Sequence, residues 1–441
     1  MRRAFSIKAW LLVLAALVMV ESVVAQPPVM LRIESWRYDD LPVWRDRIIP
    51  AFEKAHPNIK VEFTPTAPER YNATIAARLK AGAAGDLVTC RAFDEALQLY
   101  QKGYLSDLDG LAGLANFTSL AKTAWTTDDG RTTFCVPIAS VIHGFVYNKN
   151  VFARLGVAPP ATVEQFFAVL EKIRKDRRYV PLAIGTHDTW EAATLGYQNI
   201  GPTYYKGEDG RRALIAGKAK LTDPEWVEPF RMLARWRPFL GEGFEAQTYT
   251  DSQVLFTLGL AAIYPAGSWE IADFEKFPFK LGAFPPPVQK QGDKCYISDH
   301  PDIAMGMNAK SKHPAEARAF LEFVASQEFA VLYSNALPGF FSLNKSKVEL
   351  RDPLAQEFAG WRGRCESTVR PTYQILSRGT PNLEDDFWVK SAAVINGTLS
   401  PEAAAEQLQT GLARWYGPQM EKSLRRRAGS AGQKAVAREN Q

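Results

Sequence analysis

Residues 29–63, VMLRIESWRYDDLPVWRDRIIPAFEKAHPNIKVEF, decide the fold class. Val29–Trp36 alternates apolar and polar side chains, as a half-buried strand does, and Ile59–Phe63 repeats that pattern. Between these two stretches, Pro42–Ala55 carries apolar residues at helical spacing and ends before His56-Pro57. A strand, a helix and a second strand in this order are typical of an open sheet flanked by helices.

The same succession of strands and helices continues along the chain. Helices are predicted over 69–81 and 94–101, with a short buried strand over 86–90 between them. After residues 136–147, VPIASVIHGFVY, a second series begins and extends to about residue 416. A chain of 441 residues is too long for one ordinary core and suits two lobes. The sequence therefore predicts an α/β protein with two lobes.

Composition excludes several classes of protein. Hydrophobic residues make up 46% and charged residues 23%, as in a folded globular protein rather than a disordered or polytopic membrane protein. The net charge of +5 comes from the two ends, because residues 1–25 contribute +2 and residues 421–441 contribute +4. The body is close to neutral and offers no broad basic surface, so we expect no nucleic acid partner.

The N-terminal segment is typical of an export signal, and the C-terminal segment is typical of a disordered tail. Three cations in residues 2–8 precede an apolar run over 9–20, and Val23-Val24-Ala25 supplies small residues for cleavage. Twelve apolar residues span only about 18 Å of helix, which disfavours an uncleaved membrane anchor. We therefore predict a signal peptide over 1–25, cleaved near Ala25, and a periplasmic protein. Residues 421–441 are predicted to form a basic disordered tail.

Four cysteines at positions 90, 135, 295 and 365 show neither CxxC spacing nor nearby histidine pairs, so we expect no metal site. Disulfides are plausible in an oxidising compartment, and four cysteines allow three pairings. We favour Cys90 with Cys135 because both border apolar runs in the same half of the chain. The alternative is that these cysteines are buried free thiols.

The usual catalytic motifs are missing from the sequence. No GxxxxGK[ST], GxGxxG, HExxH or GxSxG spacing occurs, so nothing indicates a nucleotide cofactor, a zinc hydrolase or a serine nucleophile. We therefore expect no enzyme, no cofactor and no catalytic residue. One alternative stays open at this point: a secreted glycoside hydrolase needs only two suitably spaced carboxylates, and carboxylates are abundant.

Tryptophan, tyrosine and phenylalanine residues stand at predicted strand ends and helix starts, next to acids or glycines. Such mixtures suit carbohydrates, because an aromatic ring covers the weakly apolar face of a sugar while charged groups pair with its hydroxyls. The ends of strands are also where open α/β sheets bind ligands. The candidate ligand-binding residues are Trp36, Tyr38, Phe93, Asp94, Asp188, Trp190, Trp269, Glu270, Asp299, Phe340 and Trp388.

An ordered set of short segments resembles the extracellular solute-binding proteins of sugar ABC importers (family 1), a resemblance that covers about residues 30–412. The segments are Ala84–Val88 (AGDLV), Gly103–Leu108 (GYLSDL), Val136–Ile138 leading to Tyr147–Lys149, Gly259–Tyr264 followed by Gly267–Trp269, and Ala317–Val324 followed by Pro338-Gly339. Each segment alone is a weak signal, whereas their order is specific.

The resemblance implies a periplasmic binding fold of type II, in which each lobe is an open sheet flanked by helices. It implies three hinge crossings, near residues 139–143, near 298–302 and near Ser326. The N-terminal lobe would comprise 26–139 plus 303–326, and the C-terminal lobe 140–302 plus 327–420.

The resemblance also implies a function. The protein would capture a mono- or oligosaccharide in the cleft between its lobes and deliver it to the transmembrane subunits of an ABC permease. It would act as a monomer by hinge closure. Besides the glycoside hydrolase, a binding protein for a polyol or a glycerol phosphodiester stays open as an alternative.

Overall fold

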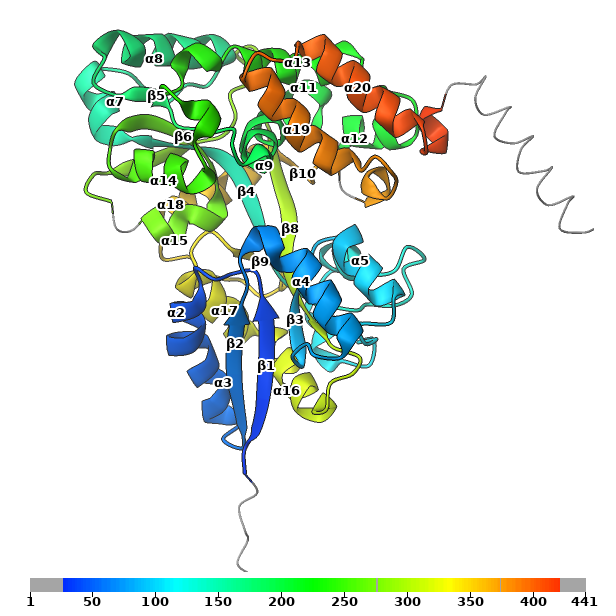
Figure 1. Ribbon diagram of the computed structural model, residues 1–441. Helices are drawn as coiled ribbons and strands as arrows, with labels where there is room; N and C mark the ends of the chain where they lie inside the picture. The colour runs from blue at the N-terminus through cyan, green and yellow to red at the C-terminus, as the bar shows by residue number, and fades with distance from the viewer. Residues whose placement is uncertain (1–26, 275–276, 373, 421–441) are drawn as a thin grey trace, which may run out of the picture.

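The computed structural model describes residues 27–274, 277–372 and 374–420. The predicted signal peptide and basic tail lie outside the described residues. Within them, we find no helix that combines the length and the apolar character needed to cross a membrane. Figure 1 shows two groups of strands and helices, one above the other, connected by long strands.

In the described residues, ten strands form one sheet, in which seven follow the order β2-β1-β3-β8-β4-β6-β5, while β7 and β9 pair with β4 and β10 pairs with β8. Parallel pairs lie at its two ends, while β8 runs antiparallel to both β3 and β4. The strands are β1 Val29–Ser35, β2 Ile59–Pro65, β3 Leu87–Arg91, β4 Val136–Asn148, β5 Val180–Leu182, β6 Ala261–Gly267, β7 Leu281–Phe284, β8 Tyr296–Met307, β9 Phe341–Ser342 and β10 Glu366–Thr368.

Helices cover the sheet in both lobes. Those of the first lobe are α2 Leu41–Val43, α3 Ile49–Ala55, α4 Pro68–Ala81, α5 Asp94–Gln101, α6 Ser119–Lys122, α16 Pro314–Val324 and α17 Gln327–Ala336. Those of the second lobe are α7 Lys149–Leu155, α8 Val163–Asp176, α9 Thr189–Glu191, α10 Gln198–Ile200, α11 Pro202–Tyr205, α12 Gly207–Ile215, α13 Pro224–Ala234, α14 Tyr249–Thr257, α15 Ile271–Phe274, α18 Pro353–Gly360, α19 Leu383–Ile395 and α20 Pro401–Ala413.

The opening strand, helix and strand form as predicted. The helix is continuous from α2 through a π-helical stretch, Trp44–Ile48, to α3. Its apolar face is buried, and the ring of Trp44 stacks on that of Phe63 from β2 with centroids 4.6 Å apart. Packing of this face therefore fixes the helix against the sheet, as the periodicity of the sequence indicates.

The buried hydrophobic residues form two separate cores. The first core runs from Leu31 to Val141 and resumes at Ile303, whereas the second core begins at Ile142. Strands β4 and β8 therefore each pass from one core to the other, as Figure 1 shows, at the two places predicted for the first two crossings.

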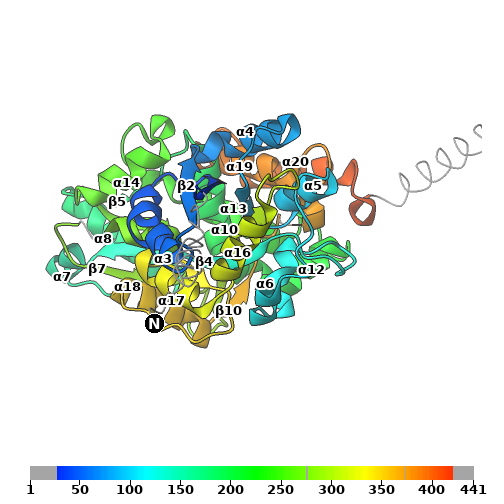
Figure 2. The ribbon, with the colours of Figure 1, turned by 90° about the horizontal axis from the view of Figure 1, so that it is seen from below.

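The third crossing lies later than the predicted position near Ser326. Ser326 is instead the N-cap of α17, where its hydroxyl accepts a hydrogen bond from Phe329 N at 3.1 Å. Helix α17 packs with the first core, which extends to Phe340, and Phe341 is the first residue after it in the second core. Viewed from below, α16 and α17 lie beside α3 (Figure 2). The chain still contacts the first lobe beyond Phe341, because Leu343 packs against the first core and Lys345 N donates to Asn116 O, so the third crossing follows residue 345.

The four cysteines form two disulfides, Cys90–Cys135 and Cys295–Cys365. The favoured pairing of Cys90 with Cys135 is confirmed, and no free cysteine is found in the described part of the chain. Strands β3 and β4 flank β8 on opposite sides, so pairing across that strand brings Cys90 and Cys135 together.

We expect peptide mapping of the unreduced protein to find these two linked pairs. Recovery of Cys90 and Cys135 as free thiols, or of either residue bound to Cys295 or Cys365, would contradict the observed arrangement. Mapping after reduction serves as the control, because the linked peptides must then disappear.

Candidate functional site

The site lies where β4 and β8 pass between the cores. Trp269, in the short helical turn Ser268–Glu270 that follows β6, is partly buried and packs against both cores. Its indole Nε1 donates a hydrogen bond to the hydroxyl of Tyr249 at 3.1 Å. The ring of Trp190 lies 4.7 Å from that of Tyr249. Two predicted aromatic residues are thus joined through a tyrosine that sequence reasoning missed.

Two predicted acids accept hydrogen bonds from this aromatic group. Asp188 accepts a hydrogen bond from Tyr249 N at 2.9 Å. Glu270 is only 1% exposed and accepts hydrogen bonds from Tyr249, Tyr264, Gln253 and Gly267. Burial raises the pKa of Glu270 to about 7. With four donors already facing it, Glu270 holds Tyr249 in place, and its prediction as a ligand contact is not supported by this geometry.

In the first lobe, Trp36 directly follows β1 and is only 4% exposed. The guanidinium carbon of Arg91 lies 4.6 Å from the centre of its ring, at a distance typical of a cation–π contact. The ring of Tyr71 is 5.5 Å away. Tyr38, by contrast, is 49% exposed. Arg91 therefore covers the ring of Trp36 in this arrangement. The sequence alone did not distinguish Arg91 from an ordinary surface residue.

Phe93 and Asp94 mark the start of α5. Phe93 has a φ of 61° and is not glycine, so its backbone is in an unfavourable region. Asp94 Oδ1 accepts a hydrogen bond from Arg378 Nε at 2.6 Å. Asp94 Oδ2 is buried and has no hydrogen-bond partner among the described residues. A strained backbone thus presents a carboxylate with one occupied oxygen and one available acceptor.

Three further acids lie at this junction of the lobes. Glu95 is exposed, and Asp302 and Glu384 are half-buried, yet desolvation by surrounding atoms raises the pKa of all three carboxyl groups. Arg370 pairs with Glu384 at 3.4 Å and also acts on Asp302, while Glu95 acts on Glu384, so the three acids lie close together between the lobes. We call the region lined by these three residues the interlobe recess.

Asp302, on β8 at the junction, is the acid that sequence reasoning missed. The guanidinium groups of Arg370, Arg91 and Arg37 each act to lower its pKa, against the larger effect of burial. Arg37 and Arg91 come from the first lobe, and Arg370 follows β10. The position of Arg37 between Trp36 and Tyr38 was a usable signal, whereas nothing in the sequence singled out Arg370.

A histidine pair lies beside these charges. His143 and His300 are fully buried, and their Nε2 atoms are 3.1 Å apart. Arg370 Nε donates to His300 Nε2 at 3.1 Å. Burial and the neighbouring Arg370 lower the pKa of both imidazoles well below the usual value. The edge of His143 faces the ring of Trp269 at 5.4 Å. Two neutral imidazoles therefore lie next to each other here, and His143 contacts the ring of Trp269.

The other predicted residues lie outside this group. Asp299 forms a bidentate ion pair with Arg362, at 2.7 and 2.8 Å, and accepts a third hydrogen bond from Ser367. Successive strand residues point to opposite faces, so Asp299 faces away from His300 and from Arg370. The carboxylate of Asp299 is therefore already occupied by Arg362 and Ser367 at the hinge. Its predicted ligand contact is not supported by this geometry.

Two predicted aromatic residues are also set apart from the group. Phe340 is fully buried in the first core, with Arg37 4.9 Å from its ring centre. Trp388 on α19 is partly buried against the second core, and its Nε1 is buried without a hydrogen-bond partner among the described residues. Phe340 therefore packs in the first core and does not face a ligand site. The indole Nε1 of Trp388 makes no hydrogen bond to the described residues.

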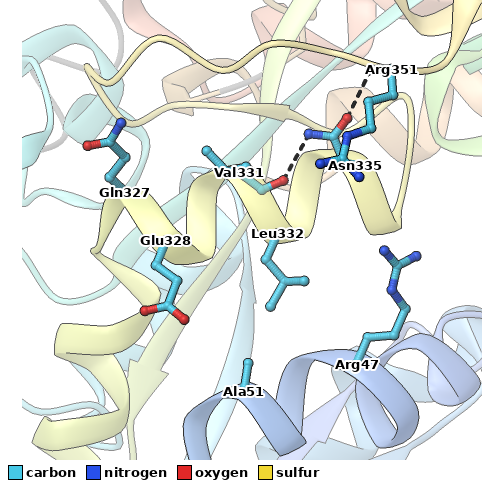
Figure 3. A pocket seen from close by; sticks show the side chains of 8 residues that line it. All are labelled: Arg47, Ala51, Gln327, Glu328, Val331, Leu332, Asn335 and Arg351. Atoms are coloured by element: carbon cyan, nitrogen blue, oxygen red, sulfur yellow. Dashed lines mark hydrogen bonds between the residues drawn. The ribbon is translucent and has the colours of Figure 1, made fainter. Parts of the chain in front are cut away.

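A separate pocket lies away from the junction (Figure 3). It is formed between the helix that ends in α3 and helix α17, and no predicted site residue lines it. Its lining residues are Arg47, Ala51, Gln327, Glu328, Val331, Leu332, Asn335 and Arg351. In the described part of the chain, no group of three or more histidine, cysteine, aspartate or glutamate residues is placed to hold a metal ion.

Comparison with known proteins identifies relatives with this architecture. Residues 38–330 match the family described as bacterial extracellular solute-binding protein. A multiple sugar-binding protein from Streptococcus mutans is 22% identical over 387 residues, which is 84% of this chain and 86% of that protein.

Two solved structures show the same fold. The solute receptor AcbH, described as having an exclusive preference for β-D-galactopyranose, superposes with a TM-score of 0.75 at 20% identity, over 87% of this chain and 98% of that one. RafE from Streptococcus pneumoniae, solved with raffinose, superposes with a TM-score of 0.72 at 22% identity, over 89% of this chain and 100% of that one.

Proposed function

The chain belongs to the family of bacterial extracellular solute-binding proteins, and from that premise we propose that it captures a carbohydrate between its two lobes for an ABC importer. The protein binds and releases its ligand without making or breaking a bond. It is exported, with cleavage near Ala25, works as a monomer in the periplasm, and delivers the sugar to the transmembrane subunits of the permease.

One observation carries the proposal: Trp269 packs against both cores at the interlobe recess, next to Tyr249 and Trp190. Aromatic faces of this kind pack on the apolar face of a sugar ring. The carboxylates of Asp302 and Asp94 and the surrounding guanidinium groups pair with hydroxyls. The names of relatives that bind multiple sugars, galactopyranose or raffinose support the same ligand class.

We propose Trp190, Trp269 and Asp94 as ligand contacts, together with the exposed Tyr38. We add Asp302, Arg91 and Tyr249, because Tyr249 is hydrogen-bonded to Trp269 and Arg91 lies over Trp36 and acts on Asp302. Contacts from both lobes form only when the lobes approach, so a bound sugar shifts the population toward closure. Binding affinity and lobe closure then depend on the same free energy.

We expect one or two sugars from a panel to raise the melting temperature, because a ligand that binds only the folded state stabilises it. The panel contains galactose, raffinose, stachyose, xylo-oligosaccharides and maltose, with glycerol phosphodiesters and polyols as the alternative class. A disaccharide of about twenty heavy atoms at about 0.3–0.4 kcal/mol each gives about 7 kcal/mol, or low-micromolar affinity.

Calorimetric titration with the stabilising sugar provides the affinity, and incubation of that sugar with the protein tests for hydrolysis. A panel in which no sugar changes the melting temperature while a polyol or phosphodiester does would replace the carbohydrate with that class. Release of reducing sugar would instead support the hydrolase.

A further inference from the structure

A single arginine connects the two lobes across the interlobe recess. Arg378 Nε donates to Asp94 Oδ1 at 2.6 Å, while its Nη1 and Nη2 donate to the two oxygens of Asp128 at 2.8 and 2.9 Å. All three nitrogens of the guanidinium are thus engaged with carboxylates. A planar fork of this kind is the geometry in which an arginine binds acids most strongly.

The partners of this arginine belong to different lobes. Arg378 follows the turn Gln374–Ser377, in which Leu376 is fully buried in the second core. Asp94 begins α5, whose Leu97 lies in the first core, and Asp128 follows Trp125 of the same core. The three charges therefore connect segments more than 240 residues apart in sequence.

We propose that Arg378 is an interlobe tie: its ion pairs with Asp94 and Asp128 hold the lobes in the observed arrangement and set the balance between closed and open forms. Arg378 acts as a positioning residue, because it also orients Asp94 with Oδ2 left as an acceptor at the recess. The tie joins two parts of this chain, so it can be tested whether or not a sugar has been identified.

The local electrostatics support a tie of moderate strength. The side chains of Arg378 and Asp94 are 31% and 11% exposed, whereas that of Asp128 is 61% exposed. Solvent screens the outer pair more than the inner one. Asp128 acts to raise the pKa of Asp94 by repulsion, so without the guanidinium two like charges would face each other at this edge. Removing Arg378 therefore abolishes its attraction to both carboxylates and leaves Asp94 and Asp128 repelling each other.

The test measures the distance between the lobes in the protein without ligand. Spin labels on K80C and K218C, exposed positions in the first and second lobes, report that distance by double electron–electron resonance, since the native cysteines are paired. We expect R378Q to lower the ratio of closed to open molecules by about fivefold, which corresponds to about 1 kcal/mol. R378K, which keeps the charge but not the fork, falls between.

A matched control is available within one lobe. Arg154 forms a bidentate pair with Asp176 at 2.9 and 2.8 Å, and both residues belong to the second lobe, so R154Q should leave the distance unchanged. Raising the salt concentration from about 0.01 M to about 1 M should open the unaltered protein and change R378Q much less.

D128N removes the exposed partner with little risk to folding and should reproduce part of the opening. Identical distance distributions and identical salt responses in the unaltered protein, R378Q and D128N would overturn the proposal. That result would leave the carbohydrate proposal standing, because no sugar enters the measurement.

Discussion

Replacing Trp269 with alanine is expected to weaken binding of the cognate sugar by more than about tenfold, which is at least about 1.5 kcal/mol. Trp269 packs against both cores, so we expect it to contact a ligand lying between the lobes and to change its surroundings on closure. Its loss removes the ring face and also the donor to Tyr249.

Calorimetric titration of W269A with the sugar found by the panel measures this effect. W269F keeps a ring face and loses only the indole donor, so its affinity should lie between those of W269A and the unaltered protein. Tyr179, which lies under Arg154 in the second lobe, provides the control, and Y179A should bind normally. Undiminished affinity of a folded W269A would remove Trp269 from the site.

The stability of the protein is expected to fall as the pH rises from about 4.5 to about 7, with Glu270 contributing about 3 kcal/mol of the change. Burial raises the pKa of Glu270 from 4.5 to about 7. The folded protein therefore binds a proton more tightly than the unfolded chain does. The corresponding stabilisation is complete below the unfolded pKa and is lost as the pH rises through the folded pKa.

Urea unfolding of E270Q at pH 5 and pH 8 isolates this contribution, because glutamine does not titrate. E270Q should be less stable at pH 5, since its Nε2 faces the Gly267 amide where Glu270 Oε2 accepts that hydrogen bond. The difference between the two proteins should shrink by about 3 kcal/mol at pH 8.

The exposed acid Glu62 on β2 supplies the control, and E62Q should follow the pH profile of the unaltered protein. Parallel profiles for E270Q and the unaltered protein would contradict the assignment of the pH dependence to Glu270.

Periodicity predicted the elements that bury a regular face. The helix that ends in α3 and strands β1 and β2 appear where the pattern places them, because a period of 2 or 3.6 residues is set by local geometry. The pattern did not assign α17 to a lobe. Its buried Phe329 and Tyr333 would suit either core, and only contact with Trp44 decides between them.

The candidate site was predicted in part for the same reason. Residue type suggested Trp190 and Trp269, which lie in one group, but it also suggested Glu270 and Asp299, whose acceptor sites are filled by their neighbours. Asp302 and Arg370 gave no signal, because an acid and an arginine 68 residues apart in sequence become partners only when β8 and the segment after β10 are folded together.

The sequence by itself determined the α/β class, the two lobes and the family, since these follow from periodicity, length and ordered motifs. Only the tertiary structure decided which side chains face the interlobe recess, which acids are already paired, and where the chain crosses for the third time. The physical reason is range: backbone periodicity acts over a few neighbouring residues, whereas ion pairing, desolvation and core packing act between residues that meet only in the folded chain.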